Sequence, residues 1–251
     1  RLRLVAHMAQ GNNLLALGEL EAARRHQLTA RDLCPQASAA GLIAQFGEDP
    51  RATNLAFLSW SEWLLGHEAE AQAAAEAARQ VAWRSGQPHT WAYVRTFEAM
   101  LAFFRQDPAA GLPLAAEVHA VAEREGLTLW QAAGSALLGW ARAGTGDPGG
   151  VEQIRRTLTL MEQAMEGVGS AFLMLLAGSQ VLLGLSDDAL GTLDAVERGM
   201  QHTGDAFLAP EAERLRGDAL WQRGEMEEAR HCWQRARDHA HQLGSPVLAE
   251  R

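Results

Sequence analysis

The chain of 251 residues is 47% hydrophobic and 21% charged, a balance typical of a globular protein and not of a disordered one. Its net charge of -9 argues against a surface that binds nucleic acid or anionic lipid, because both require clustered positive charge. Alternating runs of Val, Ile and Thr, which would indicate strands, are missing. Alanine, leucine, glutamate and arginine dominate instead, and this composition predicts an all-α protein.

Compartment and membrane association follow from a few local features. The cysteines Cys34 and Cys232 lack metal-binding spacing, and no secretory leader precedes them, so we expect a cytoplasmic protein. The most apolar stretch, residues 170–185, is short for a membrane span and polar near its middle, which indicates a buried helix and no membrane partner. Because the chain begins at Arg1 without a methionine, we expect it to be a fragment of a longer protein.

Six helical hairpins are expected along the chain, each with two amphipathic helices folded about a turn. In order, they cover residues 2–34, 51–85, 89–125, 128–166, 170–203 and 209–244. A loop-prone connector at 35–50 separates the first two hairpins, and residues 39–46 within it are compatible with a short helix.

The turn residues of these hairpins recur at nearly regular intervals. They are Gly18, Gly66, Gln106, Gly146, Gly184 and Gly224, with successive separations of 48, 40, 40, 38 and 40 residues. Small residues occupy the position seven residues before each turn and nearly every position five residues after it, so the paired helices can approach closely. Since no hairpin buries its apolar face alone, we expect neighbouring hairpins to stack into a solenoid with contacts confined to neighbours.

The first and last hairpins carry a resemblance to a known repeat. Gly11, Leu14, Gly18, Ala23 and Ala30, and likewise Gly217, Leu220, Gly224, Ala229 and Ala236, resemble the tetratricopeptide signature. Residues 6–26, 46–67 and 210–236 resemble the tetratricopeptide-like arrays behind the ATPase module of bacterial nucleotide cyclases and multidomain transcriptional regulators. The resemblance implies one all-α domain, a right-handed superhelical solenoid of about six hairpins, acting as a sensory or protein-interaction region of a larger signalling protein.

Two further patterns suggest chemistry, and their context argues against both. Residues 144–149 satisfy the GxGxxG string of dinucleotide sites, yet the expected neighbour is a helix and not a strand. His231, Cys232, His239 and His241 crowd the last hairpin, where solvated histidines on a helix surface are a simpler interpretation than a metal site. No set of nucleophile and base emerges, so we expect no catalytic, cofactor or metal site in this chain.

The tryptophans give the remaining functional signal, because several of the eight fall on the first helices of hairpins. In the resembled arrays those helices line the concave face, and aromatic rings there are suited to anchoring a partner. The candidate binding residues at inward positions are Asn12, Trp60, Trp63, Tyr93, Met100, Phe103, Trp140, Arg214, Asp218 and Trp221. The alternative is that the same rings fill the core, and the sequence does not decide between groove and core.

Three functions remain open at this level. The first is a non-catalytic module that binds a protein, a peptide or adjacent domains of the same polypeptide. The second is a domain that senses a small-molecule effector, and the third is part of an enzyme, a nucleotide cyclase or ATPase, whose catalytic domain lies outside this chain. A closed aromatic pocket with convergent polar groups would favour the effector, whereas an open groove continuous over three hairpins would favour a peptide or protein.

Overall fold

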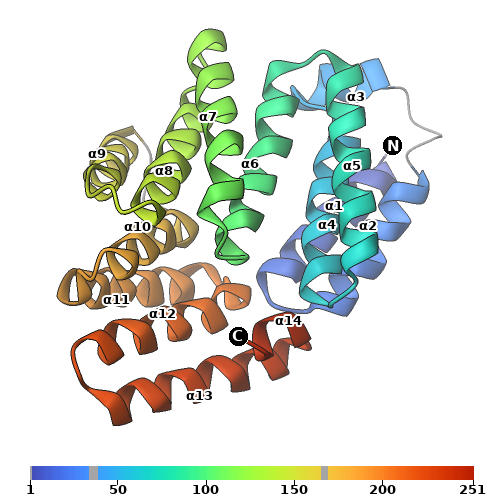
Figure 1. Ribbon diagram of the computed structural model, residues 1–251. Coiled ribbons are helices and arrows are strands. Elements are labelled where there is room, and N and C mark those ends of the chain that lie inside the picture. Colours follow the sequence, from blue (N-terminus) through green and yellow to red (C-terminus); the bar gives the residue numbers. More distant parts are fainter. Residues whose placement is uncertain (1, 34–38, 165–168) are drawn as a thin grey trace.

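The computed structural model describes residues 2–33, 39–164 and 169–251, which form fourteen α-helices and one 3-10 turn without a strand in these ranges (Figure 1). Cys34 lies outside them. The helices are α1 (Leu2–Ala16), α2 (Leu20–Leu33), α3 (Ala39–Phe46), α4 (Pro50–Leu64), α5 (Glu68–Ser85), α6 (Pro88–Phe104), α7 (Pro108–Glu125), α8 (Thr128–Gly144), α9 (Gly149–Ala164), α10 (Ser170–Leu182), α11 (Ser186–Thr203), α12 (Ala209–Gln222), α13 (Met226–Leu243) and α14 (Pro246–Ala249), with the 3-10 turn η2 (Ala206–Leu208) before α12.

Consecutive helices pack in pairs, as the repeat predicts: α1 with α2, α4 with α5, α6 with α7, α8 with α9, α10 with α11 and α12 with α13. The expectation of an all-α solenoid is therefore confirmed. The short helix considered at 39–46 forms as α3. Close pairing depends on the small residues: a methyl group added at Gly139 in α8 would lie 2.7 Å from the carbonyl oxygen of Gly150 in α9.

All the predicted turn residues have left-handed backbone conformations, with φ from 56° to 85°. Five are glycines, for which this conformation carries no Cβ penalty. The sixth, Gln106, is the one non-glycine residue with a positive φ in the described part of the chain. The GxGxxG string at 144–149 is likewise a turn between two helices, in which the Asp147 carboxylate accepts a hydrogen bond of 2.8 Å from the Gly149 amide.

The two ends of the array meet, so contacts are not confined to neighbouring hairpins as the stacking argument expected. Helix α14 packs against α4, and η2 contacts α1. The Ser245 hydroxyl donates a hydrogen bond of 2.6 Å to the Leu64 carbonyl oxygen. A methyl group added at Gly18 would lie 2.2 Å from Leu243 Cδ2, so the side chain of Leu243 abuts the first turn. Figure 1 shows the result: the sixth hairpin returns beneath the first two and closes the array into a ring.

Replacing Ser245 with alanine should weaken this closure. The hydroxyl bonds Leu64 and also accepts a hydrogen bond from the Leu248 amide at the start of α14. Losing a cap together with a buried hydrogen bond costs about 1–2 kcal/mol. Urea denaturation should detect the loss, and hydrogen exchange should accelerate around the α4–α5 turn as well as in α14. Faster exchange in α14 alone would show that the two ends of the ring are not coupled.

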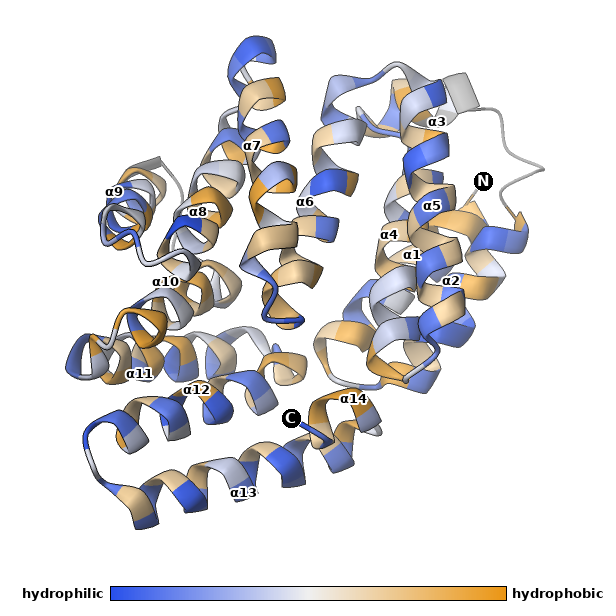
Figure 2. Ribbon diagram, viewed as in Figure 1, coloured by the Kyte–Doolittle hydropathy of each residue, from blue (hydrophilic) through white to orange (hydrophobic). Residues whose placement is uncertain are grey.

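The interior of the ring is packed with apolar side chains. One core cluster runs from Leu15 in the first hairpin to Leu248 in α14, and it includes residues of every hairpin. Hydrophobic and hydrophilic residues are interspersed along outer helices such as α5, α11 and α13, as helices packed on one side require, whereas α10 is apolar along most of its length (Figure 2). None of the described helices combines the length and the hydropathy needed to cross a membrane.

Candidate functional site

The candidate residues separate into a buried group and a partly exposed group. Trp60, Trp63, Met100, Phe103 and Trp140 are buried members of the core. Asn12, Tyr93, Arg214 and Asp218 are half-buried, and the Trp221 side chain is exposed.

The buried tryptophans of the second hairpin fill the interior of the ring. Trp60 is 7% exposed, and its indole nitrogen donates a hydrogen bond of 3.0 Å to the Phe97 carbonyl oxygen. Its ring lies 4.6 Å from that of Phe97, 5.6 Å from that of Phe104 and 6.2 Å from that of Phe207 in η2. Of the two interpretations, groove and core, core describes Trp60 and Trp63.

Four candidate residues converge on one cavity of about 110 Å³, which we call the inner cavity. Phe103 and Trp140 supply aromatic walls with ring centroids 5.5 Å apart, and Arg214 and Asp218 supply the polar side. The remaining lining residues are Gln106, Pro108, Gly178, Val181, Leu182, Glu211 and Leu215. The inner cavity thus draws residues from the third, fourth, fifth and sixth hairpins.

The polar side of the inner cavity is organised by Arg214. Its guanidinium donates two hydrogen bonds to Glu211, of 2.9 Å from Nε and 2.7 Å from Nη2, and one of 2.5 Å from Nη1 to Asp218. The three residues are spaced i, i+3 and i+7 along α12, which places them on one face of that helix. We call these residues, with Gln106, Trp233 and Arg251, the Arg214 cluster.

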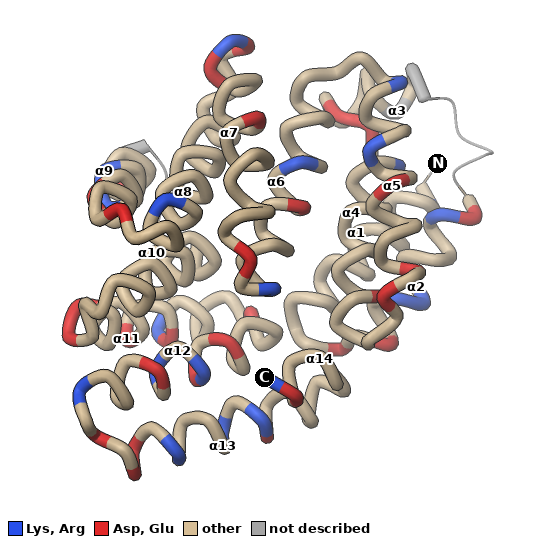
Figure 3. The backbone as a smooth tube through the Cα atoms, in the orientation of Figure 1, with Lys and Arg blue, Asp and Glu red and all other residues tan. Residues whose placement is uncertain are grey.

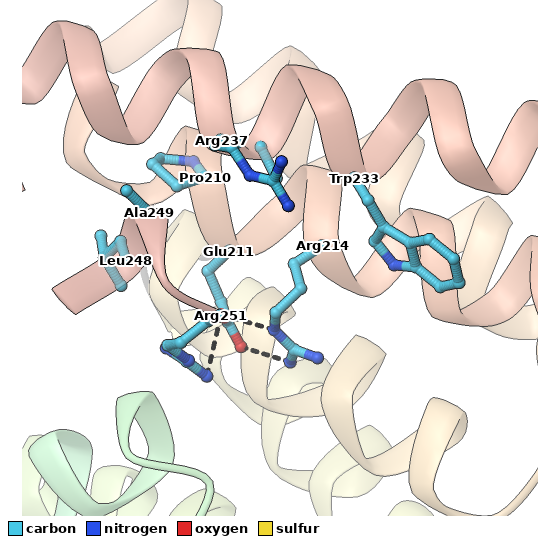
Figure 4. Close-up of a pocket in the computed structure, with 9 residues that line it drawn as sticks. Pro210, Glu211, Arg214, Trp233, Arg237, Leu248, Ala249 and Arg251 are labelled. Atoms are coloured by element: carbon cyan, nitrogen blue, oxygen red, sulfur yellow. Dashed lines mark hydrogen bonds and ion pairs between the residues drawn. The ribbon is translucent and has the colours of Figure 1, made fainter. Parts of the chain in front are cut away.

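The far side of the Arg214 cluster faces α13 and α14. The Trp233 indole nitrogen donates a hydrogen bond of 3.0 Å to Asp218, and Arg251 Nη2 lies 3.3 Å from Glu211 Oε2. Figure 4 shows Glu211 held between Arg214 and Arg251, beside a smaller cavity of about 40 Å³. The cluster therefore joins α12 to the end of the chain that follows α14.

Gln106 connects the third hairpin to this cluster, although it was not among the candidate residues. With its carboxamide oxygen turned toward the guanidinium groups, which satisfies both partners, Gln106 lies 2.9 Å from Arg214 Nε and also bonds Arg251. A left-handed conformation costs a non-glycine residue about 1–2 kcal/mol, and such strain concentrates at functional sites. The signal in the sequence was the break in the glycine series at this position.

Burial and pairing set the protonation of the cluster. Burial raises the pKa of Asp218 above its ordinary value of 3.8, although Arg214 and Trp233 act in the opposite direction. Burial acts to lower the pKa of Arg214, but the ion pairs with Glu211 and Asp218 outweigh it and raise that pKa. Two guanidinium groups thus face two carboxylates, and Asp218 is the carboxylate whose charge burial disfavours.

Replacing Asp218 with asparagine should change how stability depends on pH. Because the folded pKa of Asp218 lies above the unfolded value, the native state binds more protons between the two pKa values, and stability falls as pH rises through that window. The asparagine variant keeps a hydrogen-bonding side chain without this proton. Urea midpoints measured from pH 3 to pH 7 should therefore fall for the wild type relative to the variant across this window. Parallel profiles would show that Asp218 titrates normally.

The histidines and cysteine of the last hairpin do not assemble into a site. The Cys232 thiol is buried, Arg235 Nη2 lies 3.1 Å from its sulfur, and burial raises the pKa of that thiol. Within the described ranges, no three His, Cys, Asp or Glu side chains are placed to hold a metal ion together.

Comparison with known proteins adds no assignment to this geometry. The sequence matches no protein-family model and no curated protein, so function must be argued from the cavity and its residues.

Proposed function

We propose that this chain is a non-catalytic regulatory module that senses a small effector in the inner cavity. The observation that carries the proposal is the convergence of two aromatic rings and a half-buried, ion-paired arginine on one cavity bordered by four hairpins. The inner cavity is partly open to solvent, but its small size and its convergent aromatic and polar groups favour a small molecule over a peptide. The burial of Trp60 and Trp63 supports the same choice, because these rings do not offer an open surface.

Size and polarity restrict the effector. A cavity of 110 Å³ offers room for roughly eight water-sized groups, which corresponds to a small organic molecule. Phe103, Trp140 and Leu215 would cover its apolar body, whereas Arg214 and Asp218 would receive one polar or charged group. Such a group has to compete with the ion pairs that Arg214 forms with Glu211 and Asp218. We therefore expect the polar group of the effector to determine which molecules bind.

The position of the cavity suggests how binding would be transmitted. The Arg214 cluster links Gln106 in the third hairpin to Arg251, and the adjoining α14 packs on α4 in the second. A ligand that preferred one arrangement of these ion pairs would shift the equilibrium between closed and opened rings. The recipients we propose are a partner protein or adjacent domains of a larger cytoplasmic regulator, as the tetratricopeptide resemblance implies, with any cyclase or ATPase activity residing outside this chain and no nucleic acid bound by this region.

A fragment screen by saturation-transfer NMR would test the proposal. Carboxylic acids, amines and neutral molecules of about eight non-hydrogen atoms would be screened against the wild type. Hits in the inner cavity should lose saturation transfer with Gln106→Gly, which keeps the turn that five other hairpins make with glycine, and with Asp218→Asn. Trp83→Ala is the control, because Trp83 is 75% exposed and does not line the inner cavity. A screen without hits, or hits indifferent to both variants, would contradict effector sensing here.

A further inference from the structure

A second region with room for a ligand lies on the outside of the ring, between α5 and α7 and above α6. It consists of two recesses, which together we call the outer groove. The first has a volume of about 510 Å³ and is lined by Ala71, Gln72, Ala75, Glu76, Arg79, Glu98, Leu101, Ala102, Arg105, Asp107, Ala110 and Leu114. The second has a volume of about 450 Å³ and is lined by Ala82, Trp83, Gly86, Gln87, Pro88, Trp91, Glu117, Val121 and Arg124.

Most of the residues that line the outer groove follow a coiled-coil spacing on the three helices, with Ala71, Glu76, Trp83 and Leu101 lying beside these positions. Helix α5 contributes Gln72, Ala75, Arg79, Ala82 and Gly86, the last at its C-cap; α7 contributes Ala110, Leu114, Glu117, Val121 and Arg124; α6 contributes Pro88, Trp91, Glu98, Ala102 and, at its C-cap, Arg105. Apart from one step of seven on α6, these positions alternate steps of three and four residues, which is the period along which one helix packs against another. Helix α6 packs against both α5 and α7, so the space between α5 and α7 could hold one further helix, as in a four-helix bundle.

Paired charges separate the two recesses. Arg79 Nη1 lies 2.5 Å from Glu98 Oε1, Arg95 Nη1 lies 2.5 Å from Glu98 Oε2, and Arg95 Nη2 lies 2.7 Å from Glu117 Oε2. This row of ion pairs joins α5, α6 and α7. Figure 3 marks the acidic and basic positions along these helices. Because these charges are already paired, a partner that crosses them needs a polar side chain there and apolar side chains on either side.

The second recess presents an exposed aromatic surface. Trp83 is 75% exposed, and its ring lies 5.8 Å from that of Trp91, which is fixed by a hydrogen bond of 2.9 Å from its indole nitrogen to Glu117. A largely exposed tryptophan beside an apolar recess is the kind of anchor that interfaces use. The first recess, by contrast, is lined on both walls by alanines, which leave room for a side chain from a partner.

The distance between the recesses fits a helix. Ala75 and Trp83 are eight residues apart on α5, which corresponds to about 12 Å along the axis. An α-helix places residues i and i+7 or i+8 on one face at about this distance. Two apolar anchors separated by two turns would thus enter the two recesses, with polar residues above the ion pairs.

Charge fixes the direction of that helix. The first recess lies at the N-terminal ends of α5 and α7 and holds three carboxylates and two guanidinium groups. Glu76 and Glu98 are paired with Arg79, whereas the Asp107 carboxylate accepts a hydrogen bond from the Ala110 amide and is the acidic group left to meet a partner's cation. Arg105, one of those two guanidinium groups, is also paired with Glu68 at 2.7 Å. A helix antiparallel to α5 and α7 would bring its C-terminal turn to this acidic end, where Lys or Arg residues suit both the carboxylates and the helix dipole.

We propose that the outer groove binds one amphipathic helix of a partner protein, antiparallel to α5 and α7, with two apolar anchors two turns apart and a basic C-terminal turn. This inference does not depend on effector sensing in the inner cavity, because the two sites share no lining residue. The outer groove would serve as the contact through which the module acts on its partner.

Titration with synthetic helices tests the assignment. The probe is an amphipathic peptide of about 18 residues with leucines at i and i+7 and lysines in its last turn, followed through tryptophan fluorescence. We expect saturable binding at micromolar concentrations, weakened at least tenfold by Trp83→Ala and by Ala75→Arg, which fills the first recess and repels the lysines of the probe. Exchanging the lysines for glutamates should weaken binding to a similar extent. Trp221→Ala, which removes an exposed tryptophan outside the groove, should leave the affinity unchanged.

Three results would overturn the proposal. One is the absence of saturable binding at peptide concentrations up to about 1 mM, because a dissociation constant above that value would indicate a negligible interaction. Another is binding that is equal for the wild type and both groove variants when circular dichroism shows all three folded. The third is a concentration-dependent dimer of the protein alone that Trp83→Ala dissociates, since a second copy of the chain would then be the occupant.

Discussion

Replacing Trp60 and Trp63 together with alanine should abolish most of the stability of the protein. Both rings are buried, at 7% and 4% exposure, and both contact Phe104, at centroid distances of 5.6 and 6.4 Å. Deleting a buried tryptophan side chain costs about 3–5 kcal/mol. A native domain is stable by only about 5–15 kcal/mol, so the double variant should populate unfolded forms at room temperature.

Urea denaturation monitored by circular dichroism would measure this loss, with Trp83→Ala as the matched control. Trp83 is 75% exposed and lies outside the core clusters, so its removal should shift the midpoint little. The two single variants are expected to be non-additive, because both rings share Phe104 as a neighbour. An unchanged midpoint for the double variant would show that the rings are surface anchors after all.

The hairpins could be predicted from the sequence because their determinants are local. Each hairpin needs a left-handed turn, as at Gly18, Gly66 and Gly224, and small residues that face each other across its two helices. These determinants lie within about forty residues of chain. Ala23 and Ala229, for instance, are fully buried at equivalent positions of the first and last hairpins. Each hairpin is decided by its own pattern of spacing, so a missing or altered residue in one does not obscure the others.

Closure of the ring could not be predicted in the same way. It depends on the accumulated rotation of five successive packing contacts and on a four-residue helix, α14, beyond the last repeat. Nothing in the period of the sequence indicates that Leu243 meets Gly18, or that Ser245 meets Leu64. Sequence arguments treat a solenoid as open because each unit is compared only with its neighbours.

The inner cavity was accessible to sequence reasoning in part. The sequence analysis assigned Phe103, Trp140, Arg214 and Asp218 to inward-facing positions of the first helices, and the structure brings these four together at the inner cavity. The inward positions could not separate them from Trp60 and Trp63, which occupy similar positions but are buried, Trp60 against Phe207 of η2 and Trp63 against Phe104. Glu211 was missed although it lies three residues before Arg214, a spacing at which opposite charges pair on a helix.

Substitutions in the Glu211–Arg214 pair can distinguish a role in folding from a role in ligand binding. Glu211 is 2% exposed, accepts two hydrogen bonds from Arg214 and also lies 3.3 Å from Arg251. Replacing Glu211 alone with leucine should destabilise the protein by about 3–5 kcal/mol, because the Arg214 guanidinium, whose side chain is 15% exposed, loses its main partner. Asp194→Ala is the control, since Asp194 of α11 forms an ion pair with Arg216 of α12, and its 56% exposed carboxylate is expected to contribute at most about 1 kcal/mol.

Adding Arg214→Met to Glu211→Leu should restore much of that stability, because two apolar side chains of similar volume remove both buried charges at once. Asp218 keeps its hydrogen bond from Trp233, and Gln106 loses its main partner. Chemical denaturation of the single and double variants closes the thermodynamic cycle. If the double variant recovers its midpoint but no longer binds the fragments that the wild type binds, the ion pair serves recognition and not folding. If it stays as unstable as Glu211→Leu alone, the buried pair is instead what holds the sixth hairpin in the ring.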